Sequence, residues 1–148
     1  MSKNIIKEIR IDWNAEMLSD ILSTATYGSA WLAVTVSEES RYLVDEMKKA
    51  EPERDWCRED VFAGVLLKGG SLYMIDLYAD DDDKHYEKTL GGVPHRVSLP
   101  DFDRGAIAYA NSGNFVSLAH VIEQDGQDDY FDDNNFIQCV MFGELVYG

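Results

Sequence analysis

The sequence predicts an α+β fold: one domain, residues 1–148, in which helices pack on a small, mainly antiparallel sheet. Its 148 residues suit a single domain that buries an ordinary core without disulfides or metals. Hydrophobic residues make up 45% of the chain, and no linker or internal repeat divides it. Segments with helical and strand patterns follow one another without a regular strand-helix-strand repeat, which favours α+β over a parallel α/β fold.

The first half of the chain predicts a strand, a helix, a second strand and two further helices. Ile5, Ile9 and Ile11 alternate with charged residues, which indicates a short strand. Ala30–Val36 is short and rich in β-branched and aromatic residues, so it predicts the second strand. Capping and stop signals give the helices, which run from Asn14 to Tyr27–Gly28–Ser29, from Ser37 to Glu51–Pro52, and from Trp56 to Lys68 before Gly69.

The second half predicts a hairpin followed by helices. Ser71–Ala79 is the clearest strand in the chain, and His85–Leu90 returns beside it after an acidic tip. His95–Leu99 is a candidate third strand, and Phe115–Ile122 fits a strand or a helix equally. Two helices complete the prediction: one introduced by a capping box of Ser98 and Asp101 and ended by Asn111–Gly113, and one capped by Asp132 or Asp133 and ended by Gly143.

Charge is the most unusual global property. The net charge is −15, because 28 acidic residues face 13 basic ones, and every Lys and Arg lies at or before Arg104. Direct binding of nucleic acid by the cation-free part is disfavoured, since phosphate contacts require Lys and Arg. A basic protein is therefore the expected partner.

Acidic residues form two clusters, the second interleaved with aromatic residues. Such a pattern has two interpretations that the sequence leaves open. The carboxylates solubilise the protein, or they imitate the phosphates of nucleic acid and enter a cationic groove, with aromatic residues as apolar anchors. The candidate partner-binding residues are Asp80, Asp81, Asp82, Asp83, Glu123, Asp125, Asp128, Asp129, Tyr130, Phe131, Asp132 and Asp133.

No motif for a cofactor, a metal ion or catalysis is recognisable, so we expect none of the three. Gly69–Gly70 lacks the surroundings of a phosphate-binding loop, and neither acidic cluster fits the calcium-loop pattern. His85, His95 and His120 have no metal-ligand spacing. A nucleophile such as Cys57 with a distant histidine remains the enzymatic alternative.

The sequence also predicts where the protein resides. The first residues lack the apolar stretch and cleavage site of a signal peptide, and the longest uncharged stretch, Gly105–Ile122, is too polar for a membrane span. We therefore expect a soluble, cytoplasmic protein whose two cysteines, Cys57 and Cys139, are reduced and buried.

The closing segment Ile137–Gly148, IQCVMFGELVYG, resembles a C-terminal signature of small proteins encoded by bacterial phages and mobile elements. Those proteins end in a run like IIQYALFGEIVYG after acidic residues. Looser similarity, a Trp followed by a helix and Gly-Gly-x-Leu, extends over Trp56–Leu72; Cys139 and Val140 replace an aromatic-alanine pair, and residues 1–55 match nothing. The resemblance implies a mobile-element setting and supplies no catalytic residues.

Three functional hypotheses follow. Small acidic proteins of mobile elements often inhibit host defence, so the first is a non-enzymatic anti-CRISPR or anti-restriction protein that occupies a cationic nucleic-acid groove. The second is a small enzyme acting on a defence component or signal. The third is a self-assembling module, such as a homodimer, that uses Phe136–Tyr147 as its subunit interface.

Overall fold

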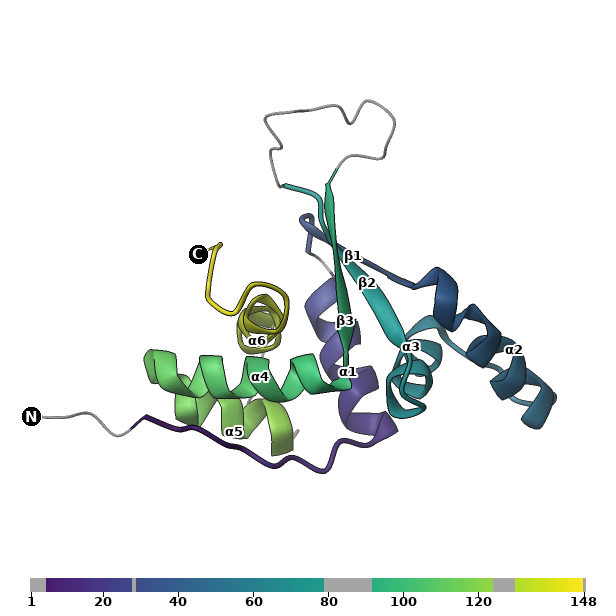
Figure 1. The fold of residues 1–148 in the computed structure, drawn as a ribbon, viewed down its shortest axis with the longest axis horizontal. Helices are drawn as coiled ribbons and strands as arrows, with labels where there is room; N and C mark the ends of the chain where they lie inside the picture. Colours follow the sequence, from purple (N-terminus) through teal and green to yellow (C-terminus); the bar gives the residue numbers. More distant parts are fainter. Residues whose placement is uncertain (1–4, 28, 79–91, 124–129, 148) are drawn as a thin grey trace, which may run out of the picture.

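The computed structural model describes residues 5–27, 29–78, 92–123 and 130–147, and it confirms the predicted α+β fold (Figure 1). Helices from both halves of the chain pack against one face of a small antiparallel sheet. The elements are α1 Ala15–Thr26, β1 Leu32–Val36, α2 Arg41–Ala50, α3 Arg58–Leu67, β2 Ser71–Asp76, β3 Val93–Ser98, α4 Leu99–Tyr109, α5 Phe115–Glu123 and α6 Tyr130–Phe142.

The sheet has the strand order β1-β2-β3, and both pairs are antiparallel. Val34 of β1 lies opposite Met74 of β2, which in turn lies opposite His95 of β3. The predicted strand from residue 30 is confirmed from Leu32 onward, and the candidate third strand is β3. The predicted return strand His85–Leu90 lies outside the described residues.

One face of the sheet is covered by helices and the other is open. Leu72, Met74 and Val97 are buried on the covered face, where α1 packs on β1, α3 on β2 and α6 on β3. Side chains on the opposite face, such as Thr35 and Arg96, are exposed to solvent. This one-sided covering explains the alternation of apolar and polar residues along the strands.

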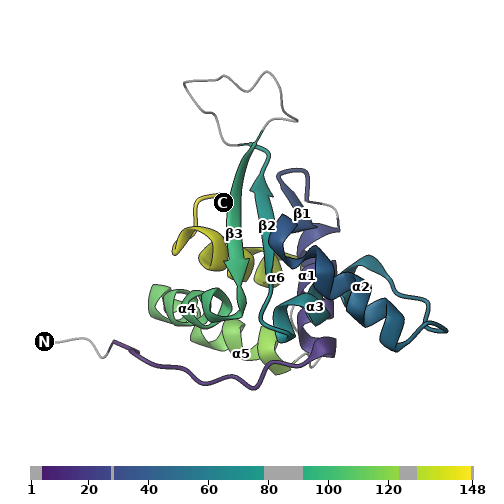
Figure 2. The ribbon, with the colours of Figure 1, turned by 45° about the vertical axis from the view of Figure 1, so that its right-hand side comes forward.

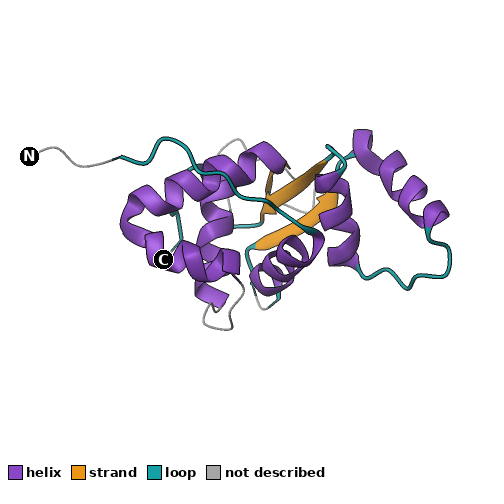
Figure 3. Cartoon of the chain, turned by 90° about the horizontal axis from the view of Figure 1, so that it is seen from below, coloured by secondary structure: helices purple, strands orange, loops and turns teal. Residues whose placement is uncertain are grey.

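The predicted first strand is wrong, because residues 5–14 form neither strand nor helix (Figure 3). This segment runs past α4 and α5, where a side chain takes the place of a strand partner: Asn111 accepts from the Ile6 N–H and donates to the Ile6 C=O, both at 2.9 Å. Further along, the Trp13 Nε1–H donates to Asp103 Oδ1 at 2.9 Å. Side-chain contacts with α4 and the bend after it therefore fix the segment.

Most predicted helix limits are confirmed by their cap geometry. Asn14 caps α1 by accepting a hydrogen bond from the Met17 N–H, and the capping box of Ser98 and Asp101 opens α4. Gly69 has φ +87°, the left-handed conformation expected after a helix. Ser37 does not cap α2: its hydroxyl bonds to the Ser71 hydroxyl at 2.7 Å, and a short 3₁₀ turn precedes the helix.

The last two helices correct one prediction and settle another. Phe115–Ile122, which fitted a strand or a helix, is helical as α5. α6 begins at Tyr130, two residues before the predicted cap, so neither Asp132 nor Asp133 is its N-cap. Both lie in its first turn, where a negative charge still favours the helix dipole. Gly143, at φ +77°, follows the helix as predicted.

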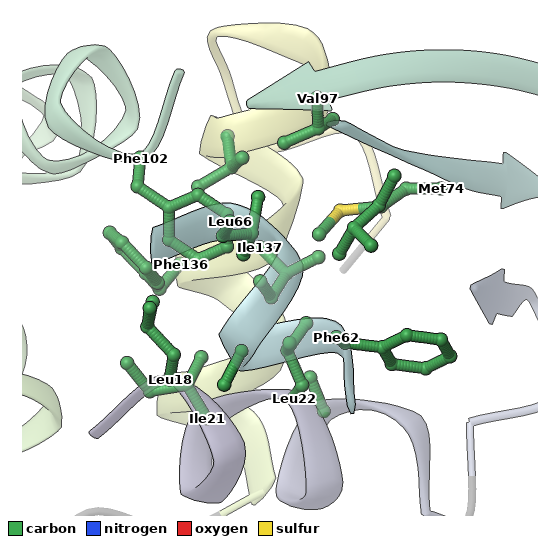
Figure 4. Packing of buried hydrophobic residues seen from close by; sticks show 14 of the residues in the cluster. Leu18, Ile21, Leu22, Phe62, Leu66, Met74, Val97, Phe102, Phe136 and Ile137 are labelled. Carbon is green, nitrogen blue, oxygen red and sulfur yellow. The ribbon is translucent and has the colours of Figure 1, made fainter. Parts of the chain in front are cut away.

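The core is built around α6, which packs on α1, α4 and α5 (Figure 4). Phe136 is fully buried and has its ring centroid 5.9 Å from Phe102 and 6.0 Å from Trp13. α4 approaches α6 closely at Gly105, where a Cβ would lie 2.6 Å from the Val140 side chain. Because Phe136, Ile137, Cys139 and Val140 are buried in their own domain, the predicted subunit interface over Phe136–Tyr147 is wrong for its helical part.

Candidate functional site

The segment after α6 is held against the body of the protein by one buried side chain. Gln138, which is 1% exposed, accepts from the N–H groups of Val146 and Tyr147, both at 2.8 Å. Its Nε2 group donates to the Tyr147 C=O at 3.2 Å and to Asn134 Oδ1 at 3.0 Å. The side-chain amide thus satisfies backbone groups that would otherwise need water.

The Tyr147 side chain completes this attachment at the end of β2. Its hydroxyl lies 2.8 and 2.7 Å from the two carboxylate oxygens of Asp76, which is only 4% exposed and also accepts from the Tyr78 N–H at 3.0 Å. The Tyr147 ring packs on Trp31 with centroids 5.1 Å apart. Much of the closing signature therefore has a structural role: it covers Trp31 and satisfies a buried carboxylate.

Replacing Tyr147 by phenylalanine will lower the free energy of unfolding at pH 7 by about 1–3 kcal/mol, because Asp76 loses its hydroxyl donor. Burial, together with the hydrogen bond to Asp76, raises the pKa of Tyr147 from 10 to about 12. The folded protein therefore holds this proton more tightly than the unfolded chain, and the resulting stability is present below pH 10 and lost as the pH rises to about 12. Urea unfolding at pH 7 and across this alkaline range measures both effects.

The matched control is Tyr78→Phe, because only the backbone N–H of Tyr78 binds Asp76. It should change stability by less than about 0.5 kcal/mol at pH 7. Tyr147→Phe should also weaken the alkaline loss without removing it, since burial raises the pKa of Tyr109 to about 12 as well. Equal stability of the two variants at pH 7 would contradict the role assigned to the Tyr147 hydroxyl.

The structure describes only some of the candidate partner-binding residues. Asp80–Asp83, Asp125, Asp128 and Asp129 lie outside the described residues. Glu123 is exposed at the end of α5, and Tyr130 and Phe131 are the first two residues of α6.

The last two candidates lie deeper than predicted. Asp132 is half-buried, and its charge adds to the effect of burial in raising the pKa of Tyr109. Asp133 is 0% exposed, so its assignment to a partner-binding surface is wrong. The reason is helical spacing: Asp133 precedes the buried residues Phe136, Ile137 and Val140 by three, four and seven positions, which places it on the core face of α6.

The structure does not bring the two acidic clusters together at the residues it describes. Glu123 closes α5, which lies beneath α4 in Figure 2. The ends of β2 and β3 that flank residues 79–91 in sequence lie at the opposite end of the molecule (Figure 2). Asp80–Asp83 and Asp125–Asp129 themselves lie outside the described residues.

The cysteines differ from the prediction at one position. Both are free, and Cys139 is buried as expected, but Cys57 is exposed just before α3. A hydrogen bond from the Cys57 thiol is the largest factor lowering the pKa of Asp60. Burial raises the pKa of Cys139 to about 11.

The described residues show no metal centre. Among them, no group of three or more His, Cys, Asp or Glu side chains is arranged to hold a metal ion. The His95 ring packs edge-on against Phe142, with centroids 5.0 Å apart. These contacts give His95 a packing role.

Two pockets were not predicted from the sequence. One, of about 140 Å³, lies beside the Arg54 guanidinium, which stacks 3.8 Å from the Trp56 ring and reaches Asp60 at 3.5 Å. The other, of about 300 Å³, is apolar and is lined by Ile9, Phe115 and neighbouring residues of α5. An Arg close to a Trp was visible in the sequence, but the packing between elements that completes each pocket was not.

No family model, no curated protein and no solved structure matches the chain. Within the described ranges, none of the helices has the length and apolar character needed to cross a membrane.

Proposed function

We propose that this protein is a non-enzymatic inhibitor that binds, through its acidic C-terminal region, the cationic groove in which another protein holds nucleic acid. The groove would belong to a host defence protein, such as a CRISPR effector or a restriction enzyme. The observation that carries the proposal is the charge distribution: residues 105–148 contain seven acidic residues and no Lys or Arg. Carboxylates in such a region meet Lys and Arg side chains that otherwise contact phosphates.

The two helices on either side of the acidic stretch support this proposal. Residues 124–129 connect α5 and α6, and both helices are anchored in the core, α5 by Leu118 and Val121 and α6 by Phe136. Anchoring at both ends limits the entropy that the stretch loses when it binds. An acidic tail without such anchors would serve solubility as well but would bind less tightly.

The test compares two variants with the same change in charge. In the first, Glu123, Asp125, Asp128 and Asp129 are changed to Gln or Asn. In the second, Asp45, Glu46, Glu53 and Asp55 are changed in the same way; these are exposed residues on and after α2. Circular dichroism and urea unfolding establish that both variants fold.

Immobilised protein is first used to capture partners from cells that carry defence systems, with elution across a salt series and competition by duplex DNA. A captured nucleic-acid-binding protein is then purified, and its affinity for each variant is measured. We expect the first variant to bind at least about tenfold more weakly and the second nearly as well as the parent.

Equal weakening by both variants would mean that net charge alone matters, which favours the solubility interpretation. The proposal would be overturned if no protein were captured. It would also be overturned if the captured protein stayed bound at high salt and in the presence of competing duplex DNA.

A further inference from the structure

Among the residues that the structure describes, the sheet has one open edge, at β1. The Trp31 C=O accepts from the Leu77 N–H at 2.7 Å, and the Ser37 N–H donates to the Ser71 C=O at 3.1 Å. Residues 31 and 37 therefore direct their backbone groups towards β2, and so do residues 33 and 35, because hydrogen bonding in an antiparallel strand alternates. Leu32, Val34 and Val36 direct theirs away from the sheet. Within the described residues, no backbone hydrogen bond joins these outward groups to any partner.

At the opposite edge, the residues of β3 themselves prevent a further strand from pairing. The same alternation directs the backbone groups of Pro94, Arg96 and Ser98 outward. Pro94 has no N–H group, and the Ser98 N–H already donates to Asp101 Oδ2 at 2.8 Å. Arg96 adds a charged side chain, which is a common protection of edge strands. A further strand can therefore add readily at β1 and not at β3.

β1 has none of these protections. Its sequence, Leu-Ala-Val-Thr-Val, contains neither a charge nor a proline. Edge strands of soluble proteins often carry one or the other, because an unprotected edge can pair with further strands. The absence of a charge or a proline at this edge therefore favours pairing of β1 with a further strand.

We infer that β1 pairs with β1 of a second copy of this chain, antiparallel and about a two-fold axis that passes beside Val34. In this register Val34 faces Val34, and Leu32 faces Val36 of the other copy. Every outward N–H and C=O of the three residues then has a partner, so the strand is complementary to itself. The two sheets join in the order β3-β2-β1-β1-β2-β3.

The net charge of −15 on each copy opposes dimerisation. This register nevertheless keeps the acidic residues next to β1 apart from those of the other copy. Glu38 and Glu39 follow β1, and the register places them opposite Ala30 and Ser29 of the other copy, not opposite each other. Glu39 is also paired with Arg96 at 2.9 Å. Like charges therefore do not face one another across the seam, where they would be destabilising. The remaining repulsion is long-range, so added salt should strengthen the dimer.

Sedimentation equilibrium over a range of protein and salt concentrations tests the assembly. We expect a monomer–dimer equilibrium whose association constant rises with salt, opposite to the salt response expected for an acidic groove ligand. The variant Val34→Pro removes an N–H that does not bond to β2, and it should weaken association at least tenfold. A protein that stays monomeric throughout overturns the inference, and the proposed inhibitor function would be unaffected.

Amide hydrogen exchange on the unmodified protein tests the register even if Val34→Pro fails to fold. The amides of Leu32, Val34 and Val36 should gain protection at concentrations where the dimer forms. The amides of Ala33 and Thr35, bonded to β2, should be protected at every concentration, and the outward amide of Arg96 at none. A dimer that leaves the exchange of Leu32, Val34 and Val36 unchanged uses another surface, and that result also refutes the inference.

Discussion

Replacing Phe136 by alanine will lower the free energy of unfolding by about 3–5 kcal/mol, the range for removing a buried phenylalanine from a packed core. Phe136 is fully buried in α6 and has aromatic contacts with Trp13 of the N-terminal segment and with Phe102 and Tyr109 of α4. These residues cannot close over the space together without moving α4 and the N-terminal segment. The loss should therefore lie at the upper end of that range.

Urea unfolding monitored by circular dichroism measures this loss. The control is Phe115→Ala, since Phe115 is 58% exposed on α5 and should contribute less than about 1 kcal/mol. If Phe136→Ala cost no more than the control, α6 would not be the centre of the core.

Replacing Gly105 by alanine will lower the free energy of unfolding by about 1–3 kcal/mol, although alanine is the better helix former. The added Cβ would lie 2.6 Å from Val140 Cγ2 and 2.8 Å from the backbone N and Cα of the same residue. Backbone atoms cannot move aside as a side chain can, so α4 and α6 must separate. The unfolding midpoint in urea should fall.

Gly64→Ala is a close control, because Gly64 also lies within a helix where another helix approaches. Its Cβ would meet the Sδ and Cε atoms at the flexible end of Met47, which can change rotamer. The gain in helix propensity, about 1 kcal/mol, should then offset most of the crowding. A destabilised Gly64→Ala beside an unaffected Gly105→Ala would reverse this interpretation of the two contacts.

The sequence predicted those parts of the fold that depend on neighbours a few residues away. Asn14 bonds to Met17, Ser98 bonds to Asp101, and Gly69 takes the left-handed conformation next to its own helix. Such caps are chemical properties of short segments, so the sequence alone is enough to locate them.

The predictions that were wrong depend on contacts between distant residues. Ile5–Ile11 has a strand-like pattern, but Ile6 bonds to Asn111, a partner that periodicity cannot reveal. Asp133 looked like a cap because it precedes the apolar stripe of α6, but the helix already begins at Tyr130, so Asp133 lies inside it on the core face. In the candidate site, likewise, Tyr147 and Asp76 meet across 71 positions of sequence, so the hydrogen bond between them could not be predicted.

α6 is the last helix in the chain, and it is also the helix on which α1, α4 and α5 pack. During synthesis, Leu18, Ile21 and Phe102 leave the ribosome before Phe136 and Ile137, the residues that cover them, have been made. The nascent chain therefore carries exposed apolar surface until its final quarter is translated, which is when chaperones can bind it. A ribosome stalled before α6 should therefore hold a chain that proteases degrade readily.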